Sequence, residues 1–323
     1  MSSSSILIVL AALSSWSLLL VVSRIVLVNF GLDPWLFTFI QMMAGGVFLI
    51  AVSGRPKGVW RTLGDPMTWL YGVLRVATAA FFTAALLYTT ATNAAFLAIL
   101  SVPTSMLVIW ILQSHRPNAW ELPGHLLILV GLFALGATLD GGFRNPAMVF
   151  MILSELCVVF STLIAELHPM NQTEDRRQRA ALTGTMLLAS ACMMLLVAML
   201  AGLLAQGAPA FAAFLPANLA WIDDPRVLLD PMLWVSAILV GILLRGPSMF
   251  LALLAIHRVK TTNYLAAMAA LPLSSLLFEL GAFQVGWLGP VSVWTLSTAF
   301  GVLMILGSLV VILARARRNP ALS

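Results

Sequence analysis

The chain is dominated by long apolar runs of about 20 residues each, the length that a helix needs to cross the bilayer core of about 30 Å. Backbone polar groups in lipid must be satisfied within the segment, so runs without strand-like alternation favour helices over barrel strands. We predict an all-α integral membrane protein with ten transmembrane helices. The predicted spans are residues 5–29, 34–53, 68–90, 92–112, 120–139, 147–167, 180–205, 232–256, 262–282 and 290–314.

Composition excludes a soluble protein. Hydrophobic residues make up 61% of the chain and charged residues 9%, against about 45–50% and about 25% in soluble domains. Cys157 and Cys192 lie within predicted spans, so neither a disulfide framework nor a cysteine-based metal site is expected. The sequence lacks GxxxxGK[ST], HExxH and GxSxG motifs, which argues against an ATP-driven pump and the common hydrolases. We therefore expect no metal and no cofactor.

The basic residues indicate topology. The net charge is +5, but most Lys and Arg residues fall on one side of the predicted spans, and these are Arg55, Lys57, Arg61, Arg116, Arg176, Arg177, Arg179, Arg258, Lys260, Arg315, Arg317 and Arg318. The opposite side receives Arg144 and Arg226. By the positive-inside rule both termini are cytoplasmic. This distribution argues against a nucleic-acid partner, and the preference for Arg over Lys suggests a bacterial inner membrane.

An equal division of the spans predicts two five-helix repeats. The first repeat covers residues 1–139, a short loop covers 140–146, and the second repeat covers 147–314, with a polar linker at 168–179 and a basic tail at 315–323. Because five is odd, the second repeat enters the membrane with inverted orientation, which places a substrate site at the midplane between the repeats. Shifting the sequence by 170 positions superposes Arg75 on Arg245 and Asn93 on Asn263.

Arg75 and Arg245 are the first candidate binding residues. A guanidinium keeps its proton in proteins, and a charge inside the bilayer needs a partner. Each arginine either binds a carboxylate or phosphate of a substrate or pairs with an internal acid to fasten helices. Tyr71 and Thr78 lie one helical turn from Arg75, and Ser248 lies near Arg245, so these polar groups share the arginines' helix faces.

Glu155 and Glu279 are the acids placed deepest in predicted spans. A buried carboxylate can carry a coupling proton, neutralise an arginine or hold a substrate ammonium group. We name Glu155 and Glu279 as proton-coupling candidates and Glu155 also as a substrate-binding candidate.

Six further residues complete the predicted substrate site, and each has a structural alternative. Trp16 lies deep in the first span and offers an aromatic face to a substrate cation or ring, and Gln41 is a polar group in the second span. Asn93 and Asn263 begin spans, where they can cap helices. Tyr88 and Tyr264 lie near those asparagines, either at a cavity mouth or in an interfacial aromatic belt.

The stretch Ala85-Leu86-Leu87-Tyr88-Thr89-Thr90-Ala91-Thr92-Asn93-Ala94-Ala95, followed by Leu97, Leu100 and Pro103, resembles the junction between the third and fourth helices of EamA-type carriers. These carriers belong to the drug/metabolite transporter superfamily. The resemblance implies ten helices in two five-helix repeats, cytoplasmic ends, and alternating-access movement of small metabolites, amino acids or drugs without ATP hydrolysis. The loop from Gln206 to Pro231 is longer than the connections usual in such carriers.

We therefore expect a secondary transporter, an exporter or exchanger of a small polar metabolite such as an amino acid or another carboxylate. A monomer and a homodimer both fit the sequence. The alternatives are a membrane-embedded lipid-modifying enzyme and a structural membrane subunit. The enzyme needs clustered catalytic groups, whereas His115, His125, His168 and His257 are scattered along the sequence.

Overall fold

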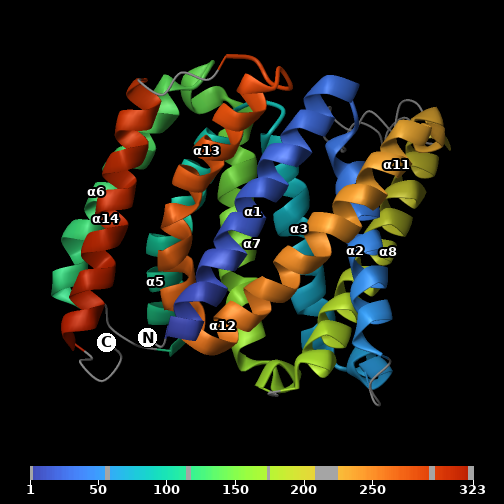
Figure 1. Ribbon diagram of the computed structural model, residues 1–323, viewed down its shortest axis with the longest axis horizontal. Helices are drawn as coiled ribbons and strands as arrows, with labels where there is room; N and C mark the ends of the chain where they lie inside the picture. Colours follow the sequence, from blue (N-terminus) through green and yellow to red (C-terminus); the bar gives the residue numbers. More distant parts are fainter. Residues whose placement is uncertain are drawn as a thin grey trace.

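The computed structural model describes residues 3–54, 59–113, 118–172, 175–207, 225–290 and 295–318 as a helical bundle (Figure 1). Its α-helices are α1 (Ser3–Phe30), α2 (Pro34–Ser53), α3 (Pro66–Ala85), α4 (Ala91–Leu97), α5 (Ser101–Gln113), α6 (Leu122–Thr138), α7 (Pro146–Leu167), α8 (Arg176–Gly207), α11 (Pro231–Val240), α12 (Gly246–Ala267), α13 (Leu271–Gln284) and α14 (Leu296–Arg318). Basic residues Arg55, Lys57 and Arg116, residues 208–224 of the long loop and residues 319–323 of the tail lie outside the described ranges.

Within the described residues, each predicted apolar run is mainly helical, and the all-helical membrane protein is confirmed. Among the described residues, eight helices are long and apolar enough to cross a membrane. One of the eight runs over 54 residues, Pro231–Gln284, but its backbone leaves helical geometry at Lys260, where φ is 69°. Helix α3, which contains Arg75, is not among the eight. The number of ten spans and the inverted repeat are therefore not confirmed.

Four helices begin with the same local signal, an Asp or Asn followed by proline. Asp33, Asp65, Asn145 and Asp230 are the N-cap residues of α2, α3, α7 and α11, and each side chain accepts a backbone N–H of the first turn. These side chains satisfy donors that a helix start leaves free. Proline suits the next position because its missing N–H would have had no intrahelical partner. The helix starts are thus fixed by short-range chemistry.

Two helix pairs approach through reciprocal glycine contacts. A Cβ added at Gly46 of α2 would lie 2.7 Å from the carbonyl oxygen of Gly184 of α8, and one added at Gly184 would lie 2.7 Å from that of Gly46. Gly124 of α6 and Gly307 of α14 have the same mutual relation, at 2.5 and 2.6 Å. Small residues let the backbones of membrane helices approach closely. Both pairs join the first half of the chain to the second.

Two short 3₁₀ turns interrupt the helices at matching places. Turn η2 (Ala98–Leu100) separates α4 from α5, and η8 (Met268–Ala270) separates α12 from α13. The two turns lie 170 positions apart, the shift that superposes Arg75 on Arg245 in the sequence. The corresponding segments of the two halves therefore share local geometry.

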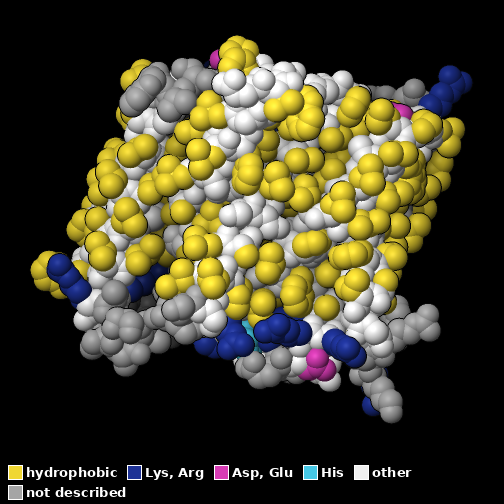
Figure 2. All heavy atoms as spheres, in the orientation of Figure 1, with side chains coloured by type: hydrophobic (Ala, Val, Ile, Leu, Met, Phe, Trp, Pro, Cys, Tyr) yellow, Lys and Arg dark blue, Asp and Glu magenta, His cyan; other side chains and the backbone are white. Residues whose placement is uncertain are grey.

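The bundle surface has the polarity of a protein in lipid. Hydrophobic side chains cover its middle, whereas Lys and Arg gather mainly along the edge where both chain ends lie (Figure 2). Large apolar side chains such as Ile111, Leu203 and Leu277 are exposed. Such extensive apolar exposure suits contact with lipid rather than water.

Candidate functional site

Trp16 of α1 lies at the centre of a buried polar cluster. The guanidinium carbon of Arg75, on α3, is 5.8 Å from the centre of the Trp16 ring, and that of Arg245 is 5.4 Å from it. These distances are within the range of cation–π attraction. Arg75 and Arg245 are each 2% exposed, and Trp16 is 9% exposed. The structure thus brings together three candidates that are far apart in the sequence.

Arg245 is positioned by a distortion of its helix. It ends η7 (Gly241–Arg245), one π-helical turn between α11 and α12. A Cβ added at Gly241 would lie 2.4 Å from the carbonyl oxygen of Gln41, so glycine permits α2 to approach this turn. The guanidinium Nε of Arg245 then donates to Oε1 of Gln41 at 2.7 Å. Wider turns of this kind are frequent at functional sites.

Arg75 has neutral neighbours at its guanidinium. Its Nη2 donates to the thioether sulfur of Met249 at 3.3 Å, and the Tyr71 hydroxyl lies within hydrogen-bonding reach. Thioether sulfur is a weak acceptor. Within the described residues, neither Arg75 nor Arg245 forms a direct ion pair, and the pairing of each arginine with an internal acid stays a prediction.

Two donors in the cluster have no hydrogen-bond partner within the described part of the chain. They are Nε of Arg75 and Nη1 of Arg245. A buried donor without an acceptor costs about 1–3 kcal/mol, and a charged one costs more. The arrangement therefore suits a ligand that brings acceptor oxygens.

Glu155 and Tyr264 complete the cluster. Glu155 of α7 is buried, faces Ser101 at the start of α5, and lies close enough to Arg75 for their charges to interact. Neighbouring Ser154 donates to the backbone oxygen of Thr78 at 3.0 Å, which fixes this turn of α7 against α3. Tyr264 is buried beside Trp16. The cluster thus contains two guanidinium groups, one carboxylate, one indole and two phenols.

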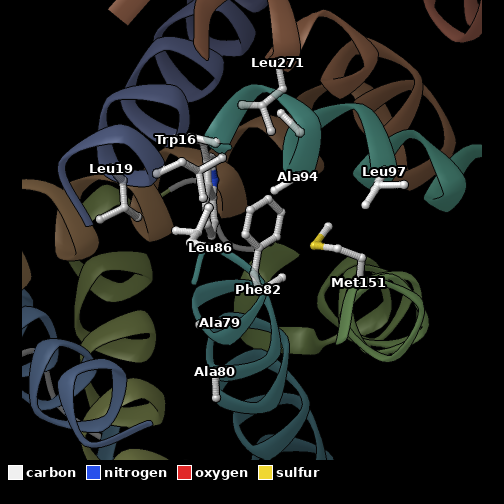
Figure 3. Close-up of a cluster of buried hydrophobic side chains, with 14 of the residues drawn as sticks. Trp16, Leu19, Ala79, Ala80, Phe82, Leu86, Ala94, Leu97, Met151 and Leu271 are labelled. Atoms are coloured by element: carbon white, nitrogen blue, oxygen red, sulfur yellow. The ribbon is translucent and has the colours of Figure 1, made fainter. Parts of the chain in front are cut away.

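Apolar clusters lie on both sides of this polar layer. The first apolar cluster includes Trp16, Leu19, Val76, Phe82, Leu86, Ala94, Met151 and Leu271 (Figure 3). The second includes Val9, Ala12, Tyr71, Val159, Leu163, Ala252 and Ile256. On α3, Arg75 lies between Tyr71 of the second cluster and Val76 of the first. Packed apolar side chains therefore border the cluster toward both ends of the bundle.

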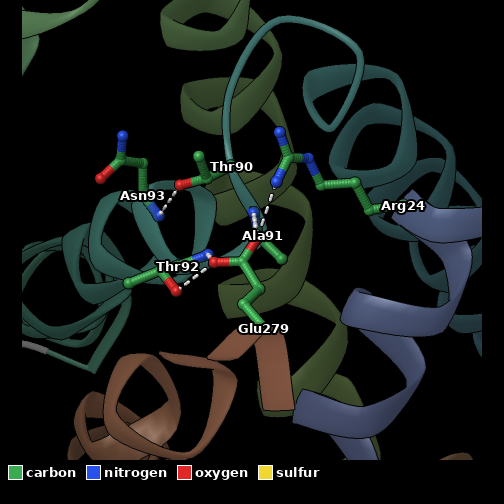
Figure 4. Close-up of polar contacts among 6 residues, drawn as sticks. All are labelled: Arg24, Thr90, Ala91, Thr92, Asn93 and Glu279. Atoms are coloured by element: carbon green, nitrogen blue, oxygen red, sulfur yellow. Dashed lines mark hydrogen bonds and ion pairs between the residues drawn. The ribbon is translucent and has the colours of Figure 1, made fainter. Parts of the chain in front are cut away.

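Glu279 lies outside this polar cluster, in a contact among three helices (Figure 4). Its carboxylate accepts the backbone N–H groups of Ala91 and Thr92, at 2.8 and 3.1 Å, and the Thr92 hydroxyl. Arg24 of α1 forms an ion pair with it at 2.8 Å. This ion pair connects α1 to α13. The proton-coupling role of Glu279 stays a prediction.

Helix capping differs from our expectation at both asparagines. The N-cap of α4 is Thr90, whose hydroxyl accepts the backbone N–H of Asn93 at 3.0 Å (Figure 4). Asn263 lies two residues inside the segment that restarts after Lys260, where Glu166 of α7 accepts the N–H of Thr261 at 2.7 Å. Caps supplied by a hydroxyl and by a distant carboxylate replace the predicted asparagine caps.

Three remaining candidates are engaged by the protein itself. The hydroxyl of Thr78 donates to the carbonyl of Leu74 at 2.7 Å, and that of Ser248 donates to the carbonyl of Arg245 at 3.0 Å. Tyr88 follows α3, and its ring centre lies 6.1 Å from that of Phe150. Tyr88 therefore belongs to an aromatic group that also contains Trp35 and Phe81.

Sequence reasoning missed Met249 and Ser101 as neighbours of the charged groups. Met249 follows Ser248 in an apolar run, and no local pattern distinguishes it from methionines that fill the core. The described residues contain no group of three or more His, Cys, Asp or Glu side chains able to hold a metal ion.

Comparisons with known proteins identify one matching family and solved structures of similar fold. Residues 3–137 match the EamA-like transporter family. No curated protein sequence matches the chain. Solved structures match it in 28 chains. One, described only as a crystal structure of a protein, is 20% identical, covers 98% of this chain and 99% of its own, and has a TM-score of 0.62. At that identity the likeness shows the fold alone.

Proposed function

Since residues 3–137 belong to the EamA-like transporter family, we propose that the chain transports a small polar metabolite such as an amino acid or another carboxylate. Membership of this non-enzymatic family implies a secondary transporter. The observation that carries the substrate proposal is the pair of buried guanidinium groups beside Trp16, each with an unpartnered donor. Carboxylates accept such donors in short, charge-assisted hydrogen bonds.

Transport proceeds by alternating access between two inverted five-helix repeats, an arrangement that makes ten spans. The matched 3₁₀ turns at Ala98–Leu100 and Met268–Ala270 support the repeat. The reciprocal contacts of Gly46 with Gly184 support a two-fold relation between the halves. Rocking of one repeat against the other exposes the central cluster to each side in turn.

The direction of movement is export or exchange at a bacterial inner membrane, with both termini in the cytoplasm. The basic edge of the bundle near the chain ends supports this orientation, since Lys and Arg accumulate on the cytoplasmic side. If protons are coupled to transport, Glu155 carries them, because it is the buried carboxylate nearest the arginines and a guanidinium does not deprotonate.

A ligand screen on the purified full-length protein tests the proposal. Carboxylates and amino acids are expected to raise the melting temperature (Tm) of the wild type and to be taken up by proteoliposomes. Arg75→Ala is expected to lose both responses, since the substrate's charge loses its partner. Arg144→Ala, which removes an exposed arginine outside the cluster, serves as the matched control. If only cations stabilise the wild type, or Arg75→Ala responds fully, the proposed site is wrong.

A further inference from the structure

The charges of the central cluster do not balance. Arg75 and Arg245 contribute two positive charges, whereas Glu155 is the one carboxylate near them among the described residues. The guanidinium of Arg245 donates to the neutral amide of Gln41, whereas Arg75 also has the carboxylate of Glu155 nearby. With Glu155 ionised, the buried cluster carries one uncompensated positive charge.

Other buried acids are already engaged elsewhere. Glu279 pairs with Arg24 at 2.8 Å. Glu121 pairs with Arg315 of α14 at 3.0 Å. Asp33 caps α2 by accepting two backbone N–H groups. Within the described residues, no further buried carboxylate is placed to neutralise Arg245.

We propose that the substrate carries two carboxylates and one ammonium group, with a net charge of −1, as an acidic amino acid does. This inference rests on the proposed function and narrows it to one substrate class. One carboxylate binds Arg75 and the other binds Arg245, whose unpartnered Nη1 awaits an acceptor. The ammonium group binds the carboxylate of Glu155, which attracts cations. Each charge of the cluster then has an opposite partner.

The shared contact with Trp16 limits the size of the substrate. Both guanidinium carbons lie within 5.8 Å of the Trp16 ring centre, so one small molecule beside this ring can place a carboxylate near each group. A neutral amino acid would leave one guanidinium uncompensated. A dicarboxylate without an ammonium group would place a negative charge beside Glu155, and like charges in a low-dielectric site repel strongly.

The decisive experiment compares three ligand pairs that differ in charge at nearly constant size. Affinities of the purified full-length protein are measured for L-aspartate and L-glutamate, for their amides L-asparagine and L-glutamine, and for succinate and glutarate. The wild type is expected to bind the acidic amino acids at least about tenfold more tightly than either other pair, since an uncompensated buried charge costs more than 1.4 kcal/mol.

One substitution is expected to reverse the order of ligand affinities. Glu155→Gln removes the negative charge while keeping the side-chain shape, so the cluster has a net charge of +2 and succinate and glutarate become the preferred pair. If this variant fails to fold, the comparison of ligands on the wild type still tests the inference.

Equal binding of amides and acids by the wild type, or an unchanged order of affinities in Glu155→Gln, overturns the inference. Uptake of neutral amino acids or monocarboxylates would overturn it while leaving the proposed function intact. Failure of every carboxylate and amino acid to bind would overturn both.

Discussion

At the scale of single residues, the main problem of this chain is how to keep two arginines inside a membrane protein. Their ring and hydrogen-bond partners are the neutral side chains of Trp16, Gln41, Met249 and Tyr71, and Glu155 is the acid that lies near Arg75. A cation–π contact contributes about 0.5–2 kcal/mol, which is less than the several kcal/mol needed to desolvate an ion. The ligand-free cluster is therefore held under electrostatic strain that an anion relieves.

Opposite effects of two substitutions at Gln41 test this strain. Gln41→Glu gives Arg245 an anionic partner in place of the amide that now accepts its Nε–H. We expect a higher ligand-free Tm and loss of anion binding, since the substrate's charge is no longer required. Gln41→Leu removes the acceptor and is expected to destabilise the protein by about 1–3 kcal/mol. Thermal unfolding with and without ligand measures both effects, and unchanged anion binding by Gln41→Glu would contradict the strain argument.

Asp33, between α1 and α2, gives a pH dependence of stability. Burial raises its pKa from 3.8 to about 6, although the N–H groups of Leu36 and Trp35 oppose the shift. The folded state thus holds the proton more tightly than the unfolded state. This contribution to stability is fully present below the unfolded pKa and is lost as the pH rises through about 6.

Asp33→Asn keeps an acceptor for the cap but has no titrating proton. We expect the decline of Tm between about pH 4 and pH 7 to be shallower in Asp33→Asn than in the wild type, because this linkage is removed. Parallel Tm curves for the two proteins would show that the pKa of Asp33 does not differ between the folded and unfolded states.

At the scale of helices, the sequence predicted position better than internal geometry. Runs of apolar residues and Asx-Pro starts are local signals, and helices lie where those signals place them. The break at Lys260, the π-helical turn before Gly246 and the cap on Ala91 depend on partners from other helices. Such tertiary contacts have no signature in a single sequence.

For the candidate site too, the sequence indicated some residues and left others undetected. A membrane-embedded charge is conspicuous in the sequence, so Arg75, Arg245 and Glu155 could be selected, and the 170-residue shift linked the two arginines. That Trp16 contacts both arginines required the packing of α1 against α12. Asn93 fitted a capping pattern, but Thr90 three residues earlier has the capping role.

Close helix packing at Gly46 provides a prediction at this scale. An alanine there would place its Cβ 2.7 Å from backbone atoms of α8, so α2 and α8 must separate. We expect Gly46→Ala to lower stability by about 1–3 kcal/mol, the usual cost of overpacking. Gly281→Ala, a helical position with no neighbouring atom within 4 Å, is the matched control and is expected to be neutral or slightly stabilising. Equal effects at both positions would contradict the packing argument, and reversible thermal unfolding distinguishes them.

At the scale of the whole molecule, the polar cluster lies between two closed ends. Part of the first apolar cluster, including Leu86 just after α3, and the Arg24–Glu279 contact lie toward the end opposite the chain termini. The second apolar cluster closes the end nearer the termini. Alternating access requires these closures to open one at a time. Because Glu279 joins α1, α13 and the start of α4, its contacts must rearrange if these helices separate.

Loss of the ion pair between Glu279 and Arg24 should therefore open the end of the bundle opposite the chain termini. In a background with Cys157→Ser and Cys192→Ser, Leu86→Cys places a thiol within the first apolar cluster, where Leu86 is 1% exposed. We expect an impermeant maleimide added outside the cell to label it several-fold faster in Glu279→Gln, since an amide leaves Arg24 without an anionic partner. Leu229→Cys, at an exposed position between α8 and α11, should label equally in both backgrounds. An unchanged labelling rate at Leu86→Cys together with a lower Tm would contradict this prediction. Glu279 would then stabilise the fold without controlling access from outside.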